Sequence, residues 1–361
     1  MKKFNFIVTM LIFYLFTLSF TGEASVMTSG GQFNTSLSAF YSKQNGFILL
    51  PHANLDLELT LSLKDNEQVR CDGYFFTDSV EGKLDFFWKK LYWMHRSENF
   101  HLSIGKQPIS WSFGSLLNPV DYTLGAVALD RDYSPKYQNA LEIYFPVNWN
   151  ASLSLVTSPS GVDRTWKAGL RGRTLIKGFD ITANCVQEDI RAGEAGEYRL
   201  GITAKGDLGP FGVYGALGYY SDGRAFSLLA GFDYSYFSPT GNQLYIQAEY
   251  LNIPSEILRE VTGSIFTFPE EEEGNIHLFA ENITYKIDEF SSIGITALYN
   301  SSAGSAILMP VYSNQLSSNS KIRIQGGILI ESLQQTEDNS LKEVFSKPAY
   351  IFLEIGLSYN F

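Results

Sequence analysis

Apolar and polar residues alternate along most of the chain, and this alternation constrains the fold more than any other feature. In ANLDLELTLSL, residues 53–63, single polar residues separate the leucines. Side chains of a β-strand point alternately to two faces, so such a stretch predicts a strand with one apolar and one polar face. The segments are about ten residues long, which is the length of a tilted strand that crosses a bilayer.

About eighteen segments carry this pattern, and each is predicted to form a strand. They begin near residues 32, 52, 67, 82, 99, 137, 148, 164, 178, 196, 210, 224, 241, 275, 291, 304, 320 and 348. Helical periodicity is nearly absent. A short helix is predicted only within PSEILREV, residues 254–261.

The connections between these segments test the count independently. Short ones follow the even-numbered segments: KDNE, SEN, IKG, DLGP, PTGN and DEF. The long ones all follow odd-numbered segments, at 108–136, 189–195, 253–274 and 333–347. Antiparallel barrels that span a membrane have short turns on one side and long loops on the other. We therefore predict an all-β fold, a transmembrane antiparallel up-and-down β-barrel of about 18 strands, with about 16 as the alternative. A secreted β-sandwich or β-helix is the competing fold, since sandwich cores also alternate.

The N-terminus has the pattern of an export signal. Lys2 and Lys3 precede the apolar run FNFIVTMLIFYLFTLSF, and small residues near Ala24 fit a cleavage site. We predict a cleaved signal peptide over 1–24 and a single barrel domain over 25–361. An uncleaved membrane anchor is the alternative.

The last strand, IFLEIGLSYNF, is predicted to close the barrel by pairing with the first strand near QFNTSLSAFYSK. Closure is required because every backbone N–H and C=O must pair internally in hydrocarbon. Tyr359 and Phe361 would then lie at the membrane interface, where aromatic residues are favoured. This strand and its final Phe resemble the assembly signal of Gram-negative outer-membrane proteins. The resemblance implies recognition by barrel-assembly machinery, location in the cell outer membrane, and contact with outer-membrane lipid and lipopolysaccharide.

The stretch GKQPISWSFGSLLNPVDYTLGAVALDRDYSPKYQNALEIYFP, which starts at Gly105, is the most distinctive. It resembles a segment of poorly characterised outer-membrane barrel families that are loosely related to porins and polysaccharide-export channels. Their pattern is Gly-[Arg/Lys]-Gln-x-Ile-x-Trp-x-x-Gly, then Asn-Pro-x-Asp. The matching residues are Gly105, Lys106, Gln107, Ile109, Trp111, Gly114, Asn118, Pro119 and Asp121, followed by Asp130 to Pro135. The resemblance covers residues 105–160 and implies barrel membership rather than a substrate. A Lys at position 106 cannot form the bidentate contacts that an Arg would form.

The connection 108–136 is too apolar for a loop in open water, and long structured loops are often functional. We predict that it folds inward as a pore constriction, with Trp111 packed on the wall. Asp121, Asp130, Arg131 and Asp132 would line the passage. A loop folded over the barrel rim is the alternative.

Charged residues on the predicted inner faces form two groups. Lys167, Arg171, Arg173, Arg199 and Lys205 form a predicted basic wall of the lumen. Asp56, Glu58, Glu331 and Glu354 form a predicted acidic wall on the opposite side. A transverse field of this kind would orient dipolar solutes. Mutual neutralisation is the alternative, and Asp180 and Arg323 interrupt the segregation.

Several classes of function are disfavoured. The net charge of −11 argues against a nucleic-acid partner, which needs a basic surface. The sequence has no zinc-spaced Cys/His cluster and no phosphate-binding glycine loop, so no metal or cofactor is predicted. Cys71 and Cys185 are interpreted as small apolar residues rather than a disulfide. His101 and Ser103 share a strand face but lack the rest of a nucleophilic set, so no enzyme is predicted. The run PEEEE at 269–273 indicates either a cation-binding loop or a solvated acidic loop.

These observations predict a porin-like channel for passive diffusion of small hydrophilic solutes. A barrel of about 18 strands has a lumen wide enough for water, unlike one of about eight strands. The alternative is a non-conducting outer-membrane barrel that serves as a surface anchor or as a component associated with export. Association into a homo-oligomer stays open, because an apolar contact patch would look like the lipid-facing surface.

Overall fold

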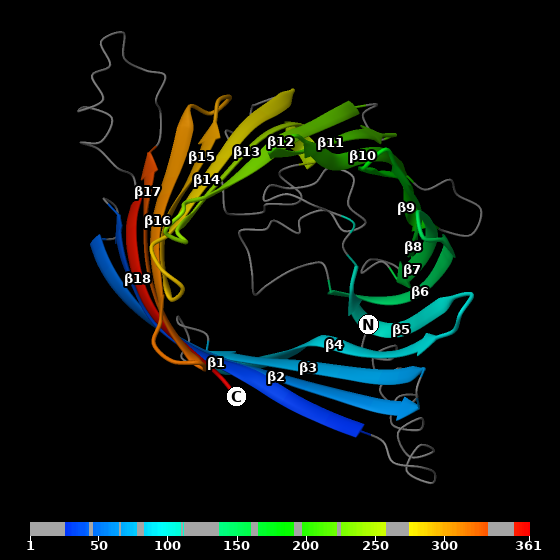
Figure 1. The fold of residues 1–361 in the computed structure, drawn as a ribbon, viewed down its shortest axis with the longest axis horizontal. Coiled ribbons are helices and arrows are strands. Elements are labelled where there is room, and N and C mark those ends of the chain that lie inside the picture. The colour runs from blue at the N-terminus through cyan, green and yellow to red at the C-terminus, as the bar shows by residue number, and fades with distance from the viewer. Residues whose placement is uncertain are drawn as a thin grey trace.

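Eighteen antiparallel strands form one closed sheet in the computed structural model (Figure 1). The structure describes residues 26–42, 46–64, 66–77, 83–109, 111, 137–159, 165–190, 197–221, 225–257, 274–330 and 350–361. The first half of the sheet contains β1 (Val26–Ser42), β2 (Gly46–Lys64), β3 (Glu67–Thr77), β4 (Leu84–Arg96), β5 (His101–Pro108), β6 (Tyr137–Asn148), β7 (Ala151–Pro159), β8 (Trp166–Ile176) and β9 (Phe179–Ile190). The second half contains β10 (Tyr198–Leu208), β11 (Phe211–Tyr220), β12 (Ala225–Phe237), β13 (Gln243–Pro254), β14 (Asn275–Lys286), β15 (Ser291–Asn300), β16 (Ser305–Gln315), β17 (Ser320–Ile330) and β18 (Tyr350–Asn360).

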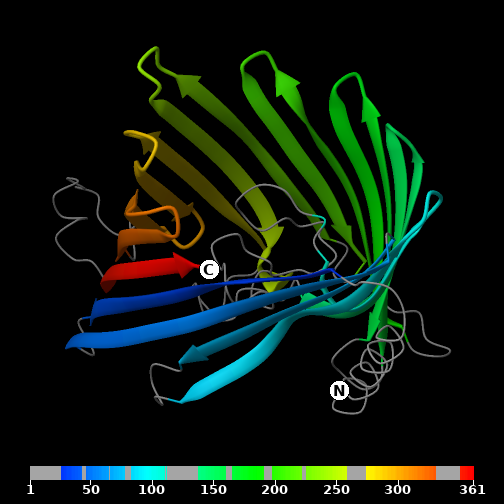
Figure 2. The same ribbon diagram turned by 60° about the horizontal axis from the view of Figure 1, so that its bottom comes forward.

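The barrel closes between its first and last strands, as predicted. β18 lies antiparallel to β1, from the pair Gln32–Asn360 to the pair Ser42–Tyr350, and Figure 2 shows the two strands side by side. Phe361 continues this pairing. Its N–H donates to the Gly31 carbonyl at 3.0 Å, and the Gly31 N–H donates to the Phe361 carbonyl at 3.1 Å. The predicted fold class and strand number are therefore confirmed.

The ring of Phe361 lies over Gly31 on the outer face of the seam. A Cβ atom on Gly31 would come within 2.5 Å of that ring and of the Asp56 carbonyl oxygen, so only glycine fits there. The ring itself is 55% exposed on the outside of the barrel. The outward residues of β18 are similarly exposed, with Leu353 at 49% and Tyr359 at 47%. The seam thus presents an apolar outer face, as the sequence predicted.

An exposed apolar band covers the outer face of the other strands as well. Large apolar side chains that are more than a third exposed point outward all around the wall, for example Leu57, Leu155, Leu170, Ile202, Leu217, Phe232, Phe279 and Ile293. Such a band is normal for a barrel in hydrocarbon. Cys71, opposite Leu59 and Leu91, and Cys185, opposite Leu170 and Leu200, lie on this outer face. Both are free cysteines in the structure.

The connections keep the predicted asymmetry. Those after even-numbered strands are short, at 65–66, 97–100, 149–150, 177–178, 209–210, 238–242, 287–290 and 316–319. The long connections, 109–136, 191–197, 255–274 and 331–349, all follow odd-numbered strands.

At 177–178, Lys177 and Gly178 both have positive φ, 49° and 84°, the geometry of a two-residue hairpin turn. In the turn 287–290, the Asp288 carboxylate accepts the N–H of Phe290 at 2.8 Å, and this hydrogen bond lowers the pKa of Asp288.

Two strands begin earlier than their alternation predicts. β1 starts at Val26 rather than near residue 32, and β2 starts at Gly46 rather than near residue 52. The two strands pair with each other over their full length, from Val26–Ser62 to Ser42–Gly46, so cross-strand hydrogen bonds extend both beyond the alternating segments.

The predicted helix at 254–261 is helical at 255–257, and its remaining residues lie outside the described part. The predicted signal peptide at 1–24 and the acidic run at 269–273 also lie outside the described residues. Among the described residues, no helix has the length and apolarity needed to cross a membrane.

Candidate functional site in the barrel lumen

The inner faces of β2, β3 and β4 carry a cluster of opposite charges. Lys89 forms an ion pair with Asp56. The Lys90 Nζ lies 2.9 Å from an Asp72 oxygen and 3.4 Å from a Glu58 oxygen. Asp56 and Glu58, predicted as an acidic wall, are therefore neutralised locally by two lysines that the sequence reading missed.

A β-bulge in β4 explains how two consecutive lysines reach the same side of the sheet. Asp72 lies opposite Lys90 and Gly73 opposite Trp88, so Lys89 is the extra residue. A bulge shifts the alternation by one position. Trp88, before the bulge, therefore points outward, whereas both lysines point into the lumen. The Lys89 ammonium also lies 4.1 Å from the centre of the Tyr74 ring.

The predicted basic wall lies on the inner faces of β8 and β10, and β9 between them supplies acids. The Glu188 Oε1 accepts hydrogen bonds from Lys167 at 3.1 Å and from Arg199 at 2.7 Å. Arg173 donates to both oxygens of Asp180 at 2.9 and 2.8 Å. The structure therefore brings the predicted basic residues to one arc but places both signs of charge there. Arg171 lies opposite Ser154 and Asn184, and Lys205 opposite Asp180 and Tyr214, in the same arc.

Glu354, the third predicted acidic-wall residue, lies far from this arc in the sheet order. Its Oε2 accepts a hydrogen bond from the Gln325 amide at 2.8 Å. A cavity of about 220 Å³ opens here against the inner faces of β17, β18, β1 and β2. Polar residues dominate its lining, including Gln32, Asn34, Asn54, Arg323, Gln325 and Ser358. Glu331, the fourth predicted member, lies outside the described residues.

The start of the long connection after β5 packs inside the barrel. Ile109 and Trp111 are 2% and 4% exposed, and they form an apolar cluster with Ala140, Val156 and Val186. Val156 and Val186 belong to the inner faces of β7 and β9, because their chain neighbours Leu155 and Cys185 face outward. Ala140 lies on the inner face of β6, five residues from the outward Phe145. Trp111 therefore lies against the inner wall. Asp121, Asp130, Arg131 and Asp132, the other predicted constriction residues, lie outside the described residues.

Gly105, which begins the segment that resembles other outer-membrane barrels, is tightly surrounded. Its φ is +130°, and a Cβ atom would clash with the Leu91 carbonyl and with Tyr92. Gln107 is buried and donates from its amide to the Ala140 carbonyl at 3.2 Å. The Lys106 ammonium lies 5.9 Å from the centre of the Phe87 ring.

A second apolar region occupies the inner face of β11 to β15. Its members are fully or almost fully buried, namely Ala216, Leu229, Leu251, Ile253, Ile276, Leu278 and Leu298. Ile257, from the short helical turn after β13, packs against them. The alternation alone did not indicate this region, because here both faces of the strands are apolar.

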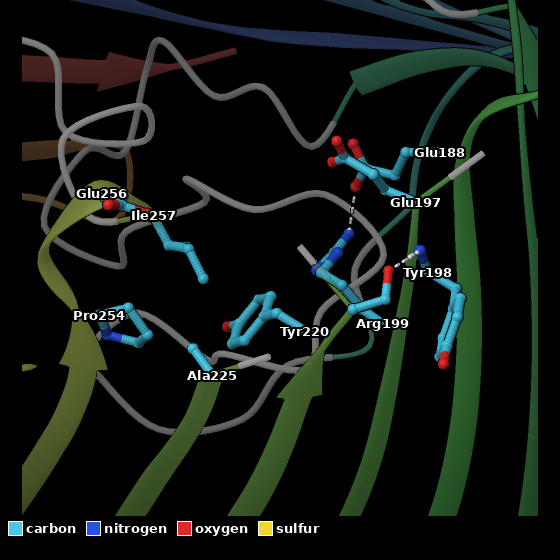
Figure 3. Close-up of a pocket in the computed structure, with 10 residues that line it drawn as sticks. Glu188, Glu197, Tyr198, Arg199, Tyr220, Ala225, Pro254, Glu256 and Ile257 are labelled. Carbon is cyan, nitrogen blue, oxygen red and sulfur yellow. Dashed lines mark hydrogen bonds and ion pairs between the residues drawn. The ribbon is translucent and has the colours of Figure 1, made fainter. Parts of the chain in front are cut away.

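A cavity of about 80 Å³ lies where the charged arc meets this apolar region, at the long-loop ends of β9 to β13 (Figure 3). Glu188 and Arg199 form one side, and Tyr220, Pro254 and Ile257 form another. The lumen mouth therefore combines charged and apolar contact surfaces.

His101 and Ser103 lie opposite Tyr144 and Glu142 in the β5–β6 pairing. Within the described residues, no hydrogen bond joins His101 to Ser103. No group of three or more His, Cys, Asp or Glu side chains in this part of the chain has an arrangement that could hold a metal ion.

No family model matches the chain, and no curated protein matches it. Several solved structures do match. Wzi of Escherichia coli, an outer-membrane protein involved in group 1 capsule assembly and described as a carbohydrate-binding β-barrel, aligns with a TM-score of 0.59. The identity is 11%, over 90% of this chain and 83% of Wzi. OpdQ of Pseudomonas aeruginosa aligns with a TM-score of 0.59 at 5% identity, over 93% of this chain and 98% of OpdQ. The outer-membrane protein opdK of the same organism gives 0.58 at 9% identity, over 92% and 98%. At such identities the likeness shows the fold, a closed barrel of the outer-membrane type.

Proposed function

We propose that the chain spans a Gram-negative outer membrane as a channel for passive diffusion of small hydrophilic solutes. The observation that carries this proposal is the contrast between the two faces of the wall at β17, β18, β1 and β2. The outer face is apolar and exposed, whereas the inner face borders a cavity of about 220 Å³ lined mainly by amides, hydroxyls and charges. A wall that is apolar outside and polar inside suits hydrocarbon on one side and water on the other.

Swelling of proteoliposomes in solutions of uncharged sugars tests this proposal. We expect a monosaccharide to enter vesicles that contain the folded barrel, and a larger oligosaccharide to enter more slowly. Vesicles without protein are the control. Equal exclusion of both sugars by vesicles that contain the folded protein would contradict a passive channel.

A non-conducting barrel is the second candidate, and the buried apolar inner face favours it. Val156, Leu229, Leu251 and Ile276 are all 0% exposed although they belong to the inner wall. Trp111, from the start of the connection after β5, and Ile257, from the start of the connection after β13, belong to the apolar clusters on these two parts of the inner wall. Wzi, which has a similar fold, is described as a carbohydrate-binding β-barrel. In this case the protein would act as a surface anchor or as a component associated with export.

The connection after β5 is proposed to set the narrowest cross-section, with Trp111 as its contact to the wall. Replacing 112–132 by a short Gly-Ser bridge should then raise single-channel conductance and relax selection by size. The same replacement at 333–347, in the long connection after β17, is the matched control and should have a smaller effect. Unchanged conductance after removal of 112–132 would place that segment outside the conduction path.

The basic residues of β8 are proposed to favour anions in the lumen. Replacing Arg171 and Arg173 together by Gln should shift the ion preference toward cations, because fixed positive charge attracts anions into a wet pore. The effect should be increased by Asp180, which loses its partner Arg173. Reversal potentials in a salt gradient measure the shift. Lys177→Gln, in the adjacent turn, removes a positive charge outside the wall and should change the preference little.

A further inference from the structure

The polar cavity of about 220 Å³ beside the seam has an indentation at Gly356, on the inner face of β18. Gly356 lies opposite Ser36 of β1 and Arg323 of β17, and both of these residues also line the cavity. Because Gly356 has no side chain, the wall is lower there than at its neighbours. A Cβ atom at this position would meet the Ser36 Cβ at 3.5 Å, an ordinary contact, so the sheet itself does not require glycine here.

The lining of this cavity consists mainly of groups that can both donate and accept hydrogen bonds. Asn34 donates to the Asn54 side-chain oxygen at 2.8 Å, and Gln325 donates to Glu354 at 2.8 Å. An amide has two N–H donors and an oxygen with two acceptor sites, so each of these amides can form more hydrogen bonds than the one that holds it in place. The lining also includes Gln32, Ser36 and Ser358. Such a surface complements a molecule rich in hydroxyl groups, which likewise donate and accept.

Charge and size restrict the ligand further. Among the described residues that line the cavity, Arg323 and Glu354 are the charged ones, and their charges are opposite. They lie on the neighbouring strands β17 and β18, so their fields largely cancel for a simple anion or cation. The cavity is several times larger than the volume of one water molecule, about 30 Å³. It therefore has room for a small, neutral, polar organic molecule.

Two aromatic rings border the cavity on the side of the long loops. Phe352 is the next inward residue after Glu354 on β18, and its ring centre lies 6.1 Å from that of Phe40 on β1. The Phe352 ring covers Gly327, where a Cβ atom would clash with it, and Phe40 is 37% exposed. The face of an aromatic ring carries partial negative charge, which attracts C–H groups. A sugar ring has C–H groups on its faces and hydroxyl groups at its edge, so it can contact these rings and the amides together.

We propose that the cavity at Gly356, together with the rings of Phe40 and Phe352, binds a neutral saccharide reversibly inside the lumen. The site deepens the channel function proposed above, and rests on it, by naming the class of solute that passes. The amides of Asn34 and Gln325 would bind hydroxyl groups, and the aromatic rings would contact the adjoining sugar unit.

Titration calorimetry of the purified, folded barrel with maltose, in a detergent without a sugar headgroup, tests the site. We expect saturable binding by the native chain. Gly356→Leu fills the indentation and should abolish it, whereas Asn34→Ala should weaken binding about fivefold, the effect of losing one hydrogen bond between neutral groups. Phe40→Leu should weaken binding and Phe40→Tyr should keep it, because only tyrosine preserves the ring. The matched control is Ser235→Leu, which adds the same side chain to the inner face of β12, beside the outward Tyr236, and should leave binding unchanged.

Heat-modifiable mobility shows whether each variant is a folded barrel. A folded native chain that does not bind maltose, or a folded Gly356→Leu chain that binds it equally well, would overturn the site. Binding of glycine in place of maltose would also overturn it, because a zwitterion could bridge Arg323 and Glu354. Ion current through planar bilayers separates this failure from failure of the channel. A barrel that conducts but does not bind maltose would refute the site alone, whereas one that binds maltose and carries no current would support the site and refute the channel.

Discussion

Arginine at Ile324 is expected to destabilise the barrel by about 2–4 kcal/mol, the cost of a cation near the midplane of the lipid face. Ile324 lies on the outer face of β17, opposite Tyr312 of β16 and Ile355 of β18, and Ile355 is 47% exposed. Arginine at the adjacent Gln325 is expected to be tolerated. Gln325 lies on the inner face and already contacts the Glu354 carboxylate, which an arginine could also bind.

Reversible urea unfolding of the barrel in lipid vesicles measures this difference. Leu59 and Thr60 on β2 form a second pair with the same arrangement, since Leu59 lies opposite the outward Cys71 and Thr60 opposite Arg70. We expect a large loss of unfolding free energy for Leu59→Arg and a small loss for Thr60→Arg. Equal losses at both positions of each pair would show that the register of the wall is wrong.

Aspartate at Phe361, or deletion of Phe361, is expected to lower the yield of folded barrel in the outer membrane strongly. The Phe361 backbone forms two hydrogen bonds with Gly31 at the seam, and its ring covers the outer side of that glycine. A charge at this position would face the membrane interface, and deletion would remove the last backbone pairing between β18 and β1. Heat-modifiable mobility of membrane fractions reports the folded amount.

Ser358→Asp is the matched control for this prediction. Ser358 lies three residues earlier in the sequence but on the inner face, where it borders the polar cavity of about 220 Å³. A negative charge there contacts water rather than lipid, so folded yield should stay near that of the native chain. Equal yields for Phe361→Asp and the native chain would contradict the role of the final residue in closing the barrel.

The fold could be predicted from the sequence because one physical constraint acts on every strand. A wall between hydrocarbon and water requires alternation, and both the closure by β18 and the side of the long loops follow from it. The bulge in β4 also had a sequence sign. Phe86 and Trp88 alternate in one phase, and Leu91 and Trp93 alternate in the other, with Lys89 and Lys90 at the change. Recognition of that phase change would have predicted two lysines facing Asp56 and Asp72.

The arrangement of charges could not be predicted fully, because it depends on which strands are neighbours. Glu188 forms ion pairs with both Lys167 and Arg199 only because β9 lies between β8 and β10 in register. The apolar inner face of β11 to β15 could not be predicted for another reason. Leu228 and Leu229 are consecutive, one outward and one inward, so the pair weakens the alternation without indicating which side is covered. The apolar cluster that contains both Trp111 and Val156 joins segments distant in sequence.

Conductance of the purified, folded protein in planar lipid bilayers tests the central claim most directly. A passive channel through the lumen predicts discrete single-channel steps with a linear current–voltage relation in symmetric salt. In a salt gradient, it also predicts that replacing both Arg171 and Arg173 by Gln shifts the reversal potential toward the equilibrium potential of the cation. A folded barrel that inserts into the bilayer and carries no current would contradict the channel and support the non-conducting barrel.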